Sequence, residues 1–99
     1  MIFRYIYRPF AKIDLKEAVK YYKAISPSLA KDFLLRIREA KKFISLSPYG
    51  DDIVYKNIRI HNLKQFPYQI HYYIDENKKQ IVILAIIFSK RKNLDFSDR

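Results

Sequence analysis

The feature that most constrains the fold is an uninterrupted apolar run, IVILAIIF, from Ile81 to Phe88. Its eight residues are far fewer than the roughly 20 that a membrane-spanning helix requires. A short run rich in β-branched residues and apolar on both sides is typical of a strand that is covered on both faces. The run therefore predicts the central strand of a sheet, and the rest of the chain has to cover it.

Two amphipathic helices are predicted ahead of this sheet. From Phe10 to about Lys23, apolar residues recur at the i, i+4, i+7 spacing of one helical face, with lysines on the opposite side. The stretch ISPS interrupts this pattern, because Ser26 is suited to cap a following helix and Pro27 to occupy its first turn. The second helix is expected from about Ser28 to Leu46, so the two form a helical hairpin.

Four β-rich segments complete the chain. One strand is expected at residues 2–7, and three more at Val54–His61, Tyr68–Asp75 and Gln80–Phe88. The order β-α-α-β-β-β predicts a two-layer α+β fold, with an antiparallel sheet packed against an N-terminal helical hairpin. No repeat or Gly/Ser-rich linker interrupts the sequence, so residues 1–99 are expected to form a single domain.

Alternation along the strands predicts what each face of the sheet carries. Ile58 and Ile60 share one face of their strand, and Ile70, Tyr72 and Ile74 share one face of the next; we expect both sets to meet the helices. The opposite, open face would then carry Asn57, Arg59, His61, Gln69, His71 and Tyr73. Cations and imidazoles on an open face indicate an anionic ligand, although a solvated strand face has the same alternation.

The charge of the chain narrows the class of its partners. Twenty Lys and Arg against ten Asp and Glu give a net charge of +10, which favours association with a polyanion or an acidic protein. The absence of cysteine excludes disulfides and thiolate metal ligands, and we expect neither a metal ion nor another cofactor. The N-terminal stretch lacks a secretory signal, so a cytoplasmic protein without a membrane partner is expected.

Five stretches, taken in order, carry a resemblance that covers nearly the whole chain: AKIDLKEAVKYY, SPSLAKDFLLRI, SPYG, YKNIRIHNLKQFPYQIHYYID and IVILAIIFSKRKN. Together they resemble the RelE/ParE superfamily of toxins from type II toxin–antitoxin modules. The resemblance implies the same β-α-α-β-β-β fold and a labile, acidic antitoxin that silences the toxin. It also implies one of two activities, which are ribosome-dependent cleavage of messenger RNA and poisoning of DNA gyrase.

For the ribonuclease activity, the resemblance implies that Arg59 and Arg91 stabilise the charge that builds on the phosphoryl oxygens. Many members carry a histidine at the end of the last strand, where this chain has Phe88, a residue that cannot transfer a proton. Three residues expected to share the open face with Arg59 are candidate replacements: His61, His71 and Tyr73.

Lysines are the remaining predicted contacts. Those near the catalytic arginines are candidates for RNA and phosphate binding: Lys56, Lys64, Lys90 and Lys92. Those on the outer side of the first helix are candidates for antitoxin binding: Lys12, Lys16 and Lys20. The segment NLDFSDR is expected to fray, because it is charged and lies at the chain end.

Three functions stay open on the sequence alone. Ribosome-dependent cleavage of messenger RNA is favoured, because the arginines and lysines suit a surface that faces RNA. Poisoning of DNA gyrase, for which no acid or base is needed, is the alternative. A basic nucleic-acid-binding module without catalysis is the third, since tyrosines on the sheet would offer stacking surfaces.

Overall fold

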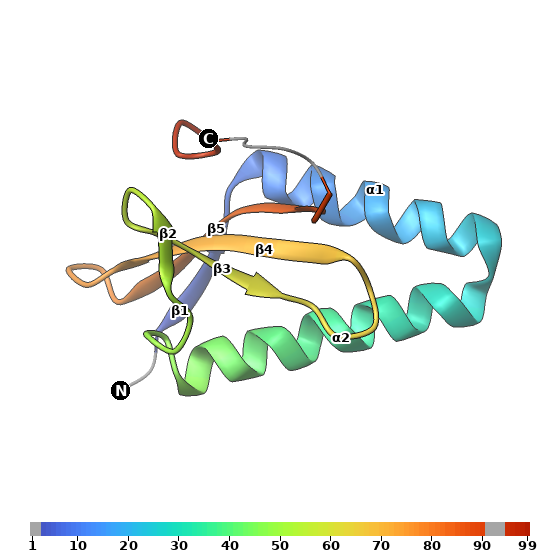
Figure 1. Ribbon diagram of the computed structural model, residues 1–99, viewed down its shortest axis with the longest axis horizontal. Coiled ribbons are helices and arrows are strands. Elements are labelled where there is room, and N and C mark those ends of the chain that lie inside the picture. The colour runs from blue at the N-terminus through green and yellow to red at the C-terminus, as the bar shows by residue number, and fades with distance from the viewer. Residues whose placement is uncertain (1–2, 91–94) are drawn as a thin grey trace.

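The computed structural model describes residues 3–90 and 95–99, which form two helices and five strands. In chain order these are β1 (Arg4–Tyr7), α1 (Pro9–Ile25), α2 (Pro27–Leu46), β2 (Ile53–Tyr55), β3 (Ile58–Asn62), β4 (Tyr68–Asp75) and β5 (Gln80–Phe88). The strands form one sheet in the order β1-β5-β4-β3-β2. The two helices run antiparallel, and their joined ends form a tip at one end of the molecule (Figure 1).

This architecture confirms the predicted α+β fold, with two differences in the sheet. The first strand, β1, pairs with β5 in parallel, whereas all other neighbouring strands are antiparallel, so the sheet is mixed. The segment predicted as one strand from Val54 to His61 is two strands, separated by a tight turn in which Lys56 has a φ of 50°. Neither glycine nor proline marks this turn, so the sequence pattern hid it.

Both helices begin at a proline, as predicted. Pro9 and Pro27 occupy first-turn positions, where the missing backbone N–H has no intrahelical acceptor to lose. The Ser26 N–H donates to the Tyr22 carbonyl at 2.8 Å, and the Ser26 hydroxyl accepts from the Leu29 N–H at 3.4 Å. One serine therefore ends α1 and caps α2. No helix in residues 3–90 and 95–99 is long and apolar enough to cross a membrane.

The main core lies between the helices and one face of the sheet. Phe33 and Ile44 of α2 and Tyr72 of β4 have no exposed surface. The Phe33 ring stacks on Tyr22 of α1, with 5.2 Å between ring centroids. Burial of each such side chain stabilises the fold by about 1.5–3 kcal/mol. Ile70, Tyr72 and Ile74 of β4 all pack in this core, which confirms the helix-facing side predicted for that strand.

The other face of the sheet is covered as well. Alternate residues of β5 form a second apolar cluster there with Ile58 and Phe96. A bulge beside His71 and Tyr72 breaks the β4–β5 register, which brings both Leu84 and Ala85 to this face. Residues 81–87 are consequently all buried, and the central strand predicted from the apolar run is confirmed.

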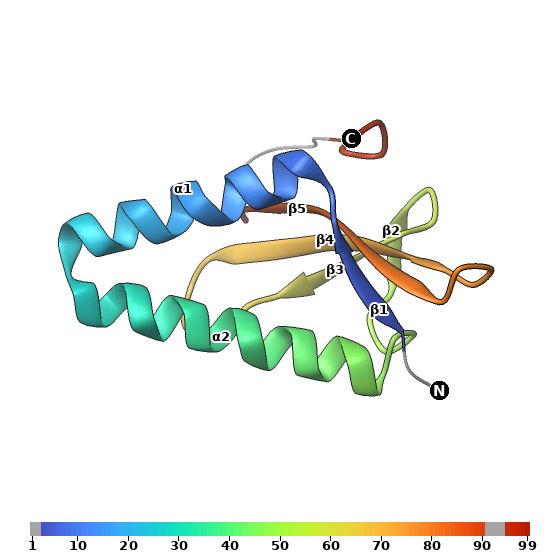
Figure 2. The same cartoon turned by 180° about the vertical axis from the view of Figure 1, so that it is seen from behind.

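The cover on this second face comes from residues 95–99, which lie beside the start of α1 in both views (Figures 1 and 2). Phe96 is 6 % exposed, and the Arg99 guanidinium donates to the Asp14 carboxylate of α1 at 2.5 Å. The prediction that this segment frays is therefore wrong for residues 95–99. Several contacts order this segment together, because burial of the Phe96 ring is joined by the ion pairs Arg99–Asp14 and Lys56–Asp95.

Candidate functional site

The predicted orientation of β3 is wrong, because the side of the strand that was expected on the open face of the sheet faces the helices. Arg59 lies opposite Tyr72, and His61 lies opposite Ile70, so both face the helices. Ile58 instead packs in the second cluster, and Ile60 lies opposite His71. Alternation states which residues share a face but not which face it is, and a shift of one residue in pairing reverses the whole strand.

For β4 the predicted face is confirmed. Tyr73 packs with the second cluster, and His71 contacts Phe96 with 5.2 Å between ring centroids. Gln69 lies beside them, its side-chain oxygen 3.3 Å from His71 Nε2. His61 and Arg59 are therefore separated by the sheet from His71 and Tyr73, and the candidate catalytic residues form two groups rather than one.

The first group surrounds Asp51, in the loop between α2 and β2. Its carboxylate accepts a hydrogen bond from the Tyr72 hydroxyl at 2.8 Å and is paired with His61 Nδ1 at 2.9 Å. The Arg59 guanidinium donates to the carbonyl oxygens of Asp51 and, at 3.4 Å, of Tyr49, and it lies over the Tyr49 ring. Side chains from two strands thus hold one loop residue in place.

Arg59 contacts this loop. Its Nη1 donates to two backbone carbonyls and its guanidinium lies over an aromatic ring, so these contacts secure the loop. Burial, with the hydrogen bond to Asp51, raises the pKa of Tyr72 well above its usual value, so this phenol stays protonated as a donor. Asp51 was missed at the sequence level, since nothing in SPYGDD distinguishes it from its neighbour Asp52.

His61 reaches a pocket. Its side chain and that of Asp51 are 17 % and 18 % exposed. Because Nδ1 is engaged by the carboxylate, Nε2 is the nitrogen left for a ligand. His61 lines a hollow of about 430 Å³ between α2 and β3, together with Arg36, Phe43 and Lys64. Lys64, a predicted phosphate contact, is thus placed beside His61.

The second group surrounds His71, which is 4 % exposed. Its Nδ1 lies 2.9 Å from the Tyr55 hydroxyl, and its Nε2 bonds to the Gln69 side chain, so both ring nitrogens have partners. Burial, with the nearby Arg99 cation, lowers the pKa of His71 to about 4. The imidazole is consequently neutral at pH 7 and enclosed beneath Phe96.

Three further residues predicted to act in catalysis or phosphate binding lie within the described part of the chain. Tyr73 is half-buried and accepts a 3.4 Å hydrogen bond from Arg8. Lys56 is exposed, but it pairs with Asp95 at 2.8 Å and donates to Ser97 at 2.7 Å. Lys90 is exposed in the turn after β5. Arg91 and Lys92, also predicted as site residues, lie outside the described residues.

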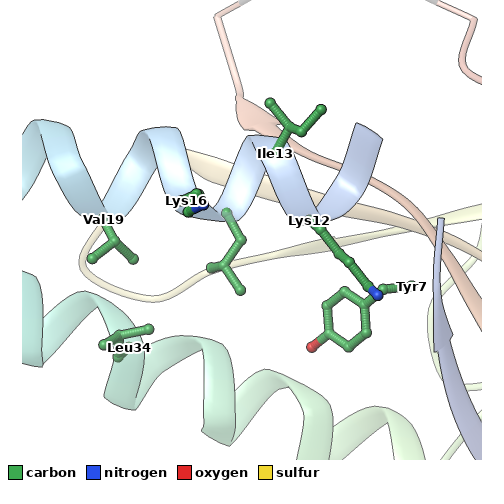
Figure 3. A pocket seen from close by; sticks show the side chains of 7 residues that line it. Tyr7, Lys12, Ile13, Lys16, Val19 and Leu34 are labelled. Atoms are coloured by element: carbon green, nitrogen blue, oxygen red, sulfur yellow. The ribbon is translucent and has the colours of Figure 1, made fainter. Parts of the chain in front are cut away.

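An apolar groove lies between α1 and α2, with a volume of about 550 Å³ (Figure 3). We call it the α1–α2 groove, and its lining residues are Tyr7, Lys12, Ile13, Leu15, Lys16, Val19 and Leu34. The predicted antitoxin contacts Lys12 and Lys16 lie on its wall, and the Lys12 side chain extends toward the Tyr7 ring (Figure 3). Lys20 is exposed one turn further along α1.

Comparison with known proteins decides the family. Residues 5–93 match the family described as the ParE toxin of the type II toxin–antitoxin system parDE. The chain belongs to the ParE toxin family. None of the curated protein sequences matches this ParE-family chain significantly. The superfamily resemblance is thus confirmed, and the chain is a toxin of a type II toxin–antitoxin system.

Two solved structures share the fold of this ParE-family toxin. The chromosomal ParDE system from P. aeruginosa matches with a TM-score of 0.76 and 20 % identity, over 90 % of this chain and 98 % of that one. The RelBE2 toxin–antitoxin complex from Mycobacterium tuberculosis matches with a TM-score of 0.61 and 15 % identity, over 89 % and 99 %. At such identities the likeness shows the fold alone.

Within residues 3–90 and 95–99, no group of three or more His, Asp or Glu side chains is arranged to hold a metal ion.

Proposed function

We propose that this ParE-family toxin stops growth by binding its target without cleaving RNA, and that the target is DNA gyrase. The observation that carries the proposal is the separation of the candidate catalytic groups. Arg59 and His61 lie on the helix side of the sheet, whereas His71 and Tyr73 lie on the other. A poison that acts by binding needs no such groups to meet.

Cleavage of RNA makes stricter demands. A base has to reach the 2′-hydroxyl while a cation reaches the same phosphate, with separations of roughly 3 Å. His71 is buried with both nitrogens engaged, and Arg59 is bound to carbonyls of its own loop. The favoured activity from the sequence, ribosome-dependent cleavage, thus finds less support here than the gyrase alternative.

One observation favours cleavage as a second candidate. His61, paired through Nδ1 with Asp51, lines a hollow that Lys64 and Arg36 also line. A carboxylate that fixes an imidazole tautomer in this way is the arrangement of a general base and its positioning residue. In that candidate His61 would accept the 2′-hydroxyl proton.

For the partner that silences the toxin, we propose an acidic antitoxin whose amphipathic segment fills the α1–α2 groove. The groove floor is aliphatic, and Lys12 and Lys16 stand on its wall. A helix with apolar residues on one face and carboxylates beside them would match both features. The chain's charge of +10 would speed its encounter with such a segment.

The test is a purified assay with two targets. The toxin is added to gyrase with supercoiled plasmid, and separately to ribosomes translating a defined message. We expect accumulation of cleaved gyrase–DNA complexes and an intact message. Codon-linked cleavage of the message with unaffected gyrase would instead select the ribonuclease, and His61→Gln should then abolish it. If gyrase is unaffected and the message also stays intact, both candidates are contradicted.

A further inference from the structure

A second exposed apolar surface lies at the tip of the helical hairpin, away from the α1–α2 groove. The last turns of α1 meet there with the start of β4 and the end of β5 around a hollow of about 440 Å³. We call it the hairpin-end surface, and its lining residues are Tyr21, Tyr22, Ile25, Pro67, Tyr68 and Phe88.

Several large apolar side chains of this surface are exposed to solvent. Tyr21 and Ile25 are each 60 % exposed and Phe88 is 40 % exposed, although neighbouring members of the same surface, such as Tyr22, are buried. Aromatic and aliphatic side chains gathered around a hollow, with buried rings beneath them, have the composition of a binding hot spot. A hydrogen bond joins the start of β4 to the end of β5 at this surface, since the Ser89 N–H donates to the Pro67 carbonyl at 2.7 Å.

Phe88 gives this surface a particular significance. It occupies the end of β5, where the superfamily resemblance implies a histidine in many members, and residues 81–87 before it are all buried. Its ring lies edge-on to Tyr68, with 5.8 Å between centroids. The residue at this position cannot transfer a proton, and its exposed ring is available as an apolar contact for binding.

The two apolar surfaces lie on different sides of α1. Val19 lines the groove and Tyr21 lines the hairpin-end surface; residues two apart on a helix point about 200° from one another. One partner in the groove would therefore leave the hairpin end exposed. A toxin that has both an antitoxin and a target has a use for two such surfaces.

The charges around the hairpin end indicate the partner. All six residues that line the hollow are uncharged. The adjoining hollow shares Tyr21, Tyr68 and Phe88 and is also lined by Asp14 and Glu17. An apolar centre beside carboxylates suits a protein partner, because these carboxylates would repel the phosphates of a nucleic acid.

We propose that the hairpin-end surface binds the protein target of this toxin, leaving the α1–α2 groove to the antitoxin. This inference rests on the proposed function, because it concerns a toxin that works by binding. It adds where the target is held, and it assigns Tyr21, Ile25 and Phe88 as the contacts at the centre of that interface.

The test compares two double variants in binding to purified gyrase holoenzyme. Tyr21→Ser/Ile25→Ser removes the hairpin-end side chains. Leu46→Ser/Val54→Ser is the matched control, because these residues are 75 % and 59 % exposed and lie at the other end of α2 and on β2. We expect the first variant to bind at least ~10-fold more weakly than the parent chain, and the control to bind within about twofold.

Other outcomes overturn the inference. Equal affinity for parent and hairpin-end variant, with both folded by circular dichroism and thermal unfolding, removes the surface from target binding while leaving gyrase as the target. A parent chain that is a dimer in sedimentation, and becomes monomeric in the hairpin-end variant, assigns the surface to a second copy. Salt-sensitive binding of bare DNA that only this variant loses assigns it to nucleic acid.

If the parent chain fails to bind gyrase at all, the proposed target is wrong and growth arrest becomes the readout for the surface. Loss of arrest in the hairpin-end variant, with arrest retained in the control at equal expression, supports target binding by this surface. Arrest retained in both folded variants contradicts it. The single variant Tyr21→Phe should still cause arrest, because the ring and its apolar contacts remain.

Discussion

The two histidines of the chain lie on adjacent strands, and their surroundings differ in almost every respect. His61 is paired with Asp51 and borders an open hollow, whereas His71 is enclosed by Tyr55, Gln69 and Phe96 with its pKa lowered to about 4. Both are strand residues with polar side chains in an alternating pattern. Their chemistry is decided by the face on which each one lies and by what covers that face.

The largest effect is expected from removing the cover over His71. Phe96→Ala should lower the free energy of unfolding by about 3–5 kcal/mol, because the ring is 6 % exposed and packs on the apolar second face of the sheet. Denaturant unfolding measures this. Leu46→Ala, at a side chain that is 75 % exposed, is the control and should change little. A small loss for Phe96→Ala would mean that the segment does not hold the face closed.

The second largest effect on the free energy of unfolding is expected from acidification, which acts through the enclosed His71. The pKa of His71 is lowered from 6.5 to about 4 in the folded chain, so between these values the unfolded chain binds a proton that the folded chain does not. His71 therefore stabilises the fold fully above about pH 6.5, and this contribution falls by roughly 1.4 kcal/mol per pH unit as the pH drops toward about 4.

The slope is measured by unfolding between about pH 6.5 and 5.5, above the usual range of carboxyl groups. His71→Gln should remove it. The same slope in that variant would show that another group carries the acid sensitivity.

A substitution in the group around His61 should lower the free energy of unfolding by less. Asp51→Ala removes the acceptor for both the Tyr72 hydroxyl and His61 Nδ1, so we expect a loss of about 1–3 kcal/mol in unfolding free energy. Asp52→Ala, at the exposed neighbour, is the control. Equal stability of the two variants would mean that Asp51 makes no net contribution, and that Arg59 alone holds the loop.

The smallest effect is expected for growth inhibition by His61→Gln. Because we propose that the toxin acts by binding, arrest should persist at equal expression in a host that lacks the antitoxin. Growth curves after induction measure this, with His71→Gln as the companion variant. Loss of arrest in His61→Gln alone would favour the ribonuclease and give His61 its catalytic role.

These differences also mark how far the sequence could be read. Helix periodicity, the prolines at 9 and 27, and the apolar run of β5 each have a local cause, and all were predicted. The face of β3 was not, because it depends on pairing with β4 and on an unmarked turn at Lys56. Phe96 and Asp51 were missed because their partners are distant in sequence.

The most direct test follows the imidazole proton resonances by NMR between pH 8 and pH 4.5. The chain has two histidines, so His61→Gln leaves one signal and assigns it to His71. Enclosure beneath Phe96 predicts that this signal stays at its neutral-form position down to about pH 5. A midpoint near pH 6.5 would instead show an accessible His71, and the second face of the sheet would again be a candidate for catalysis.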